Sequence, residues 1–351
     1  MVASVSIMAQ KVQTVDTDGN PVSYASISNA DNGNIIGTTD LQGVLPDVGG
    51  VRSIAITHVA FKPQVVKVSE LPADGRVTLT ESDFDLPEIT VEPKEYIYVQ
   101  TYYRMFFMED DTLFYYRAGL TDNEYNIPKK KLSASTRNFS RSGMGGFVRW
   151  LLDAIIGSKA DQHSELSIEN IAFNTSKSGL SLRPETDSRQ AVLYGDSLVG
   201  FMVDDVQDHQ RRISIDDRIF VRLYWNDRQT EKKQKKRAER EAKRKNVVST
   251  RYLVYAMDDD HQCGISDFIS SQIHDDYDQF SERHQKDVHN RLWIEVFTTD
   301  RAYCTRDELK ARKRENKLKL NFESILEFER QHQIPPAPAN TIEALRKIVE
   351  D

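Results

Sequence analysis

Between Gly19 and Val68 the chain alternates turn residues with short apolar runs, and this rhythm constrains the fold more than any other feature. The first turn, at residues 18–21, reads Asp-Gly-Asn-Pro, which combines a glycine that accepts φ > 0 with a proline that fixes φ. A second reversal is expected at residues 37–43. Apolar residues such as Ile54 and Ile56 recur at every second position, which is the period of a strand. Further runs at residues 65–68 and 77–79 complete roughly seven short strands, so the pattern predicts a small β-sandwich over residues 11–92.

This pattern resembles the carboxypeptidase-regulatory-like domain, which is common at the N-terminus of secreted and outer-membrane proteins of Bacteroidota. The resemblance covers about residues 10–92, and residues 86–91, Leu-Pro-Glu-Ile-Thr-Val, resemble the tail that precedes a second region in such proteins. Residues 58–61, His-Val-Ala-Phe, depart from the Gly-aromatic pair that is more usual in the family. The resemblance implies a prealbumin- or Ig-like sandwich that is non-catalytic, in an exported protein.

The length of 351 residues is sufficient for two domains that each bury a core. Charged residues make up 29% of the chain and the mean hydropathy is -0.57, values typical of a soluble protein. Since there is no run of about 18 uncharged apolar residues, we expect no membrane-spanning helix. We predict a signal-peptide remnant at 1–10, the sandwich at 11–92, a larger α+β domain of unknown function at 93–334 and a C-terminal helix at 335–351.

The N-terminal ten residues are apolar and small, and they end in Met-Ala-Gln before Lys11. They resemble the end of a signal peptide, which predicts export to the periplasm or outer membrane. A disordered or first-strand leader is the alternative.

The second region is expected to be β-rich with a helical end. Aromatic residues crowd residues 102–116 and are interrupted by acidic residues at 109–111, which favours a hairpin in a sheet core over a sugar-binding platform. Short apolar runs predict strands at 180–182, 191–194, 198–203, 219–225, 251–255 and 292–297. Residues 145–157 predict a short helix, packed in a core or inserted at a membrane surface, and residues 307–331 carry apolar residues at helical spacing.

The segment 228–245 holds ten basic and three acidic residues. We expect a solvated helix or an excursion between two strands, with contact to anionic lipid as the alternative. Nucleic acid is not expected as a partner, because the segment lacks aromatic residues for stacking and the whole chain carries a net charge of -7.

Histidines and carboxylates gather between Asp258 and His289, where a metal could find ligands. The weak candidates are His261, His274, Asp276, His284 and His289. Their spacing matches neither two imidazoles on one helical face nor a calcium-binding loop, so polar surface with an acidic helix start is the favoured interpretation.

Signatures of serine hydrolases and of phosphate-binding loops are missing from the sequence, so we predict no set of catalytic residues and no cofactor. Cys263 and Cys304 could form a disulfide in an oxidising compartment or could remain two separate thiols.

Taken together, the sequence predicts an exported, non-catalytic envelope or surface binding protein with an unknown protein or glycan partner. The alternative is a hydrolase or metal-dependent enzyme whose site lies near Asp258–His289.

Overall fold

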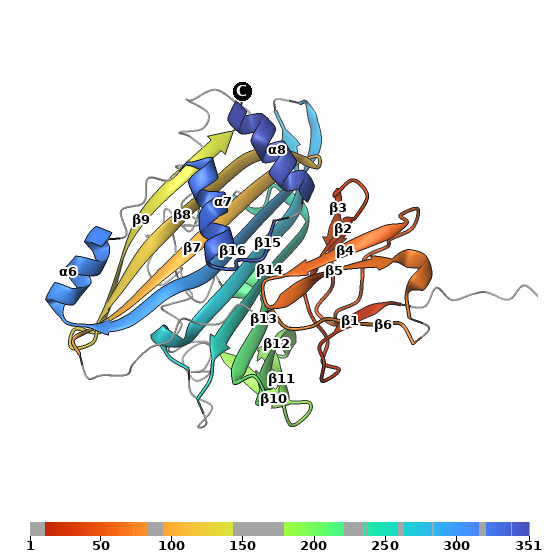
Figure 1. The fold of residues 1–351 in the computed structure, drawn as a ribbon. Coiled ribbons are helices and arrows are strands. Elements are labelled where there is room, and N and C mark those ends of the chain that lie inside the picture. Colours follow the sequence, from red (N-terminus) through yellow and green to blue (C-terminus); the bar gives the residue numbers. More distant parts are fainter. Residues whose placement is uncertain are drawn as a thin grey trace, which may run out of the picture. The chain divides into compact units, whose positions relative to one another are not determined.

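The computed structural model describes residues 11–72, 74–82, 94–142, 179–220, 235, 238–239, 241–258, 263–282, 284–315, 321–337 and 339–350. The chain divides into two compact units, with the division after Ser82 (Figure 1). Strands dominate both units and helices are few, which confirms the predicted β-rich fold class.

The first unit is a small β structure. Its strands are β1 (Gln13–Val15), β2 (Ser26–Asn29), β3 (Ile35–Thr38), β4 (Ser53–His58), β5 (Phe61–Lys67) and β6 (Arg76–Thr78), followed after β5 by the short helix η1 (Val68–Glu70). Strands β3-β2-β4-β5 form an antiparallel sheet, and β1 pairs in parallel with β6. The described part of this unit therefore has six strands where roughly seven were expected. After the turn at residues 18–21 the first strand of the sheet begins only at Ser26, because the backbone at Tyr24 is left-handed, with φ of 66°.

Gly43, in the second predicted turn, cannot be replaced by a residue with a side chain without a backbone clash. Gly43 has φ of +74°, and a Cβ placed there would lie 2.6 Å from the carbonyl oxygen of Thr14. Its own carbonyl accepts the backbone N–H of Thr14 at 2.8 Å. A side chain at this position would therefore separate β1 from the turn that it contacts.

The second unit is built on one antiparallel sheet of ten strands, in the order β10-β11-β12-β13-β14-β15-β16-β7-β8-β9 (Figure 1). The strands are β7 (Tyr96–Glu109), β8 (Thr112–Asn126), β9 (Lys131–Ser142), β10 (Leu180–Pro184), β11 (Arg189–Tyr194), β12 (Ser197–Asp205), β13 (Gln210–Asp216), β14 (Arg244–Ala256), β15 (Phe268–Ser281) and β16 (Lys286–Cys304). The aromatic segment 102–116 forms the β7–β8 hairpin, as predicted.

Side chains alternate between the two faces of this sheet, as the period of a strand requires. Along β7, Ile97, Val99 and Tyr103 join a large buried apolar cluster. Tyr98 and Tyr102 point to the opposite face, where they meet the C-terminal helices.

Three helices lie against this opposite face: α6 (Arg306–Glu315), α7 (Phe322–Gln331) and α8 (Ala339–Glu350) (Figure 1). Leu309 of α6 packs in a cluster with Tyr98, and Phe328 of α7 packs on Tyr102. Helix α7 begins after Asn321, whose side chain accepts the backbone N–H of Ser324 in a capping box. No helix in the described ranges is long and apolar enough to cross a bilayer.

In the second unit, residues 219–220 of the expected strand at 219–225 are helical, and residues 221–225 lie outside the described residues. Residues 210–216 form a strand, β13, that the apolar pattern did not predict. The apolar pattern does not predict β13 because this strand buries a charged side chain. Arg212 of β13 is buried in an ion pair with Asp205 of β12, at 2.9 Å. The acidic helix start expected between Asp258 and His289 does not occur in residues 268–281, which form β15.

Three predicted features fall outside the described residues: the signal-peptide remnant at 1–10, the tail-like segment at 86–91 and the helix at 145–157. The basic segment 228–245 is described in part. Lys235, Ala238, Glu239 and Glu241 are helical and exposed, and Arg244 already belongs to β14.

Candidate functional site

The helix-facing side of β15 and β16 carries a row of polar and aromatic side chains. The antiparallel register sets Asp278 opposite His289, Asp276 opposite Arg291 and His274 opposite Trp293. Because side chains alternate with a period of two, residues 274, 276 and 278 share one face. Polar side chains are most densely grouped where β15 ends and β16 begins.

His289 is held between two carboxylates there. Its Nδ1 lies 2.7 Å from Oδ1 of Asp278, and its Nε2 lies 2.7 Å from Oδ1 of Asp276. Both ring nitrogens of His289 are therefore within hydrogen-bonding distance of a carboxylate oxygen. The hydrogen bond from His289, followed by that from the Asn246 amide, lowers the pKa of Asp278.

The β7–β8 turn completes the arrangement. Asp110 and Asp111 form this two-residue turn, and both have positive φ, 47° and 62°, as tight hairpin turns require. Asp110 accepts the Lys286 ammonium at 2.7 Å and the backbone N–H of His289 at 3.0 Å. These contacts, of which the one with Lys286 is the largest, lower the pKa of Asp110. Arg291 pairs with Asp111 and, at 3.3 Å, with Asp276.

We call this group the strand-end cluster. Its members come from two strands, β15 and β16, and from the β7–β8 turn, and they are Asp110, Asp111, Asp276, Asp278, Lys286, His289 and Arg291. Most are partly exposed, and each is already engaged in an ion pair or hydrogen bond within the chain. The cluster fixes positive and negative side chains at defined positions on the surface. Protonation of its carboxylates would weaken these ion pairs.

His274 lies on the same strand but in a different environment. It is buried, and its ring meets Trp293 edge-on with centroids 4.8 Å apart. Burial lowers the pKa of His274 to about 3, so the ring is neutral at physiological pH. Its Nε2 has no hydrogen-bond partner among the described residues.

A second charged network is buried farther along the same face. The Arg104 guanidinium donates to Glu295 of β16 at 2.5 Å, to Glu329 of α7 at 3.0 Å and to the carbonyl of Pro335 at 2.7 Å. Tyr102 donates to Glu329 at 2.6 Å. We call Arg104, Glu295, Glu329 and Tyr102 the buried network, and it fastens α7 and the segment after it to the sheet.

Burial and charge set the protonation of this network. Burial alone would lower the pKa of Arg104, but the two carboxylates outweigh it and raise that pKa. Burial raises the pKa of Tyr102 and, despite the opposing charge of Arg104, also that of Glu295. A fully hydrogen-bonded ion network of this kind specifies packing rather than offering a reactive group.

The structure brings together only two of the residues that the sequence suggested as metal ligands, Asp276 and His289. His274 is buried elsewhere on β15, His284 pairs with Glu109 at 2.9 Å, and His261 lies outside the described residues. Sequence reasoning missed Asp278 and Arg291. The strand period would place residues 276 and 278, and residues 289 and 291, on one face, whereas neither helical spacing nor a calcium-binding loop relates them.

The two cysteines are separate thiols, the second of the two alternatives. Cys304 is buried in a cluster with Tyr98 and Leu309, whereas Cys263 packs against the large apolar cluster. Burial raises the pKa of Cys263 to about 12, which makes this thiol a poor nucleophile.

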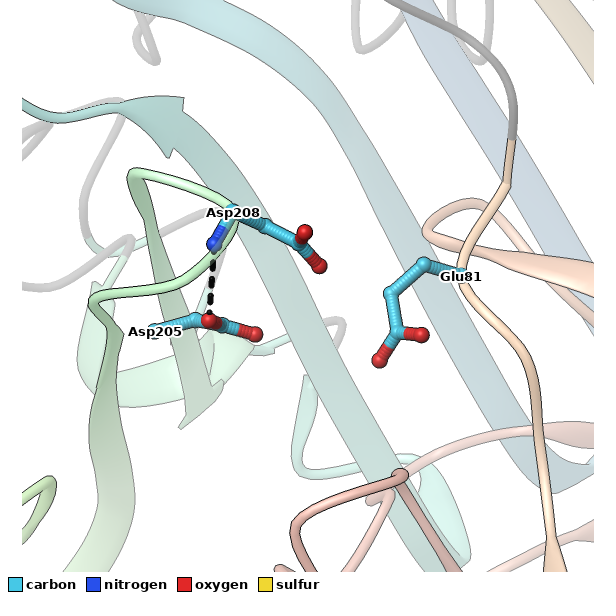
Figure 2. Close-up of side chains that lie close together, drawn as sticks. All are labelled: Glu81, Asp205 and Asp208. Atoms are coloured by element: carbon cyan, nitrogen blue, oxygen red, sulfur yellow. Dashed lines mark hydrogen bonds between the residues drawn. The ribbon is translucent and has the colours of Figure 1, made fainter.

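The side chains in Figure 2 make contacts that are local to each unit. Asp205 ends β12 and accepts the backbone N–H of Asp208 at 3.0 Å, which closes the turn into β13 (Figure 2). The third side chain in Figure 2, Glu81, belongs to the first unit, where it accepts from Thr17 at 3.4 Å.

A small apolar cavity is lined by residues of β10 to β14. Its volume is about 10 Å³, roughly the space of one water molecule, so it is not a ligand pocket. Its lining is Leu180, Val192, Met202, Ile213, Ile215, Phe220 and Leu253.

Comparison with known proteins yields no family. No protein-family model matches the chain, and no curated protein matches it either. Among solved structures, one similar chain is lipovitellin, described for its lipid–protein interactions, with a TM-score of 0.27 and 11% identity. The match covers 60% of this chain and 26% of the lipovitellin chain, and a TM-score this low carries no argument about fold or function.

Proposed function

We propose that this protein is a non-catalytic binding protein of the cell envelope, exported across the inner membrane, with a protein or glycan as its partner. The sequence of residues 10–92 supports export, because it resembles a module of exported proteins. The strand-end cluster supports binding rather than catalysis.

The observation that carries the proposal is the clamping of His289. Both of its ring nitrogens are engaged by carboxylates at 2.7 Å, so the histidine best placed for acid–base or metal chemistry already has two partners. The neighbouring charges are paired in the same way, Lys286 with Asp110 and Arg291 with Asp111. Such a surface suits recognition of a polar partner by exchange of ion pairs.

The alternative proposal is a metal-dependent enzyme or hydrolase that uses this same region. It requires a metal cation to bind a ring nitrogen of His289 in place of a proton. The same cation would also bind the carboxylate of Asp276 or Asp278. The two proposals therefore differ in what a divalent metal does to His289.

Titration of the protein with zinc tests this difference. Calorimetry measures zinc binding, and NMR monitors the signals of the His289 ring. We expect no saturable zinc binding that depends on His289. One equivalent of zinc bound by the native chain and lost in His289→Ala, with His284→Ala as the matched control, would favour the enzyme instead.

Fractionation of the native protein tests the location. We expect it in the periplasmic or outer-membrane fraction, and recovery in the cytosol alone would contradict the envelope assignment.

The basic segment 228–245 supports a subsidiary proposal, contact with anionic lipid, because its described residues Lys235 and Lys243 are exposed. Co-sedimentation with phosphatidylglycerol vesicles should fall when residues 232–243 are replaced by a Gly/Ser loop. Neutral phosphatidylcholine vesicles are the control.

A further inference from the structure

The ten-stranded sheet ends in two very different edge strands. Among the described residues, β10 at one edge has five residues and contains Pro184, which cannot donate to a neighbouring strand. At the other edge, β9 has twelve residues and contains no proline. Its register with β8 runs unbroken from Lys131 to Ser142, without a bulge. Proline and bulges are common devices that protect an edge from pairing, and β9 has neither of them.

Two contacts show which backbone groups of β9 point away from β8. The hydroxyls of Thr136 and Thr121 lie 3.0 Å apart, as expected where opposed residues do not exchange backbone hydrogen bonds. The carbonyl of Arg137 faces Gly119 of β8, since a Cβ on that glycine would lie 2.3 Å from its oxygen. Arg137 therefore directs its N–H and C=O toward β8, and its neighbour Thr136 directs them outward, as does Ala134 two residues earlier.

The side chains along this edge leave room for another strand. Ser133, Ala134 and Ser135 near its start are small and exposed. Lys129, Lys130 and Lys131 precede them, and all three are exposed. No acidic residue occurs between 127 and 142, in a chain whose net charge is -7.

We infer that β9 is a docking edge for an extended acidic segment of a partner protein, which adds to the sheet as an eleventh strand. The inference deepens the proposed function and rests on it. Main-chain hydrogen bonds to residues such as Ala134 and Thr136 supply affinity, and the three lysines select acidic residues. A second copy of the chain fits less well, because pairing β9 with itself would bring basic residues against basic residues.

The probe is a fluorescent peptide of about ten residues that alternates Glu and Val, a strand-length segment. Its binding to the full-length protein should be saturable and should weaken as salt rises. A peptide that alternates Lys and Val is the control and should not bind. Replacing Lys129, Lys130 and Lys131 together by Ala should weaken binding about tenfold or more.

Proline scanning separates main-chain docking from charge alone. Thr136→Pro removes an outward N–H while leaving the ladder with β8, so it should abolish binding with little change in the melting temperature. Thr136→Val keeps that N–H and should still bind. Ala134→Pro with Ala134→Val repeats the comparison, in case the first proline variant does not fold.

Hydrogen exchange supplies an independent check. In the protein alone, the amides of Ala134 and Thr136 should exchange fast, and the peptide should protect them. Equal binding by the proline and valine variants, or protection of these amides without peptide, would overturn the docking edge. In-cell cross-linking from other exposed positions that captures a specific envelope partner would leave the proposed function intact even then.

Discussion

The buried network and the strand-end cluster lie on the same face of the same sheet, yet they differ in almost every physical respect. Arg104 is 1% exposed and bridges a strand, its neighbour and a helix, whereas His289 is 37% exposed at its side chain and bridges two residues of one strand. Water screens the second set of charges and not the first. Burial, rather than the number of charges, therefore decides which network holds the fold together.

The largest expected effect comes from Arg104→Ala. The substitution leaves Glu295 and Glu329 buried without their counter-charge and should lower the free energy of unfolding by about 3–5 kcal/mol. Urea unfolding followed by tryptophan fluorescence measures this, because all three tryptophans lie in the second unit.

The triple variant Arg104→Met, Glu295→Leu, Glu329→Met is the control for that experiment. It removes all three charges together, so it should recover much of the lost stability. A loss below about 1 kcal/mol in Arg104→Ala would show that the buried network contributes no more to the free energy of unfolding than exposed ion pairs do. The two networks would then not differ in this respect.

The next effect is a pH dependence that arises from His274. Its folded pKa is lowered to about 3, while in the unfolded chain it is near its ordinary value of about 6.5. The unfolded chain therefore binds the proton more readily. The stabilising contribution is complete above pH of about 6.5 and is lost as the pH falls toward 3, about 4–5 kcal/mol in all.

His274→Phe keeps a ring against Trp293 and removes the titrating group. The urea midpoint of this variant should fall less than that of the native chain between those pH values. Parallel curves for the two proteins would mean that His274 is protonated in the folded state.

A smaller effect is expected at the strand-end cluster. His289→Ala removes the larger of the two hydrogen bonds that depress the pKa of Asp278, so that pKa should rise toward its ordinary range, and stability should change by less than about 1 kcal/mol. NMR titration of the Asp278 carboxylate follows the pKa directly.

Asn246→Ala is the matched variant, because Asn246 provides the second hydrogen bond to Asp278, at 2.7 Å. It should raise the same pKa by less than His289→Ala does. The reverse order would contradict the clamp geometry around His289.

The smallest effect should come from Lys245→Ala. Lys245 pairs with Asp287 at 2.7 Å, but the two side chains are 62% and 46% exposed. Holding two solvated side chains together gains little, so the melting temperature should not change measurably. A clear drop would mean that exposed pairs at the strand ends support the fold, and the contrast with the buried network would then weaken.

Local sequence determined much of the β architecture. Turn residues and alternating apolar positions predicted the strands at Ile54 and Ile56 and the aromatic hairpin around Asp110, because both are set by interactions between near neighbours. The same logic failed at β13 and β15, since apolar alternation disappears when a strand buries charged side chains such as Arg212 beside their partners.

Tertiary structure alone decided the candidate site. Arg104 and Glu329 are 225 residues apart in sequence, and no local pattern links them. His274 and Asp276 are two positions apart on the same face of β15, yet one is buried against Trp293 and the other pairs with exposed groups. The sequence determines which faces its residues share, because that follows from the strand period. Which of those residues lose contact with water depends on what packs over them, and only the folded chain sets this.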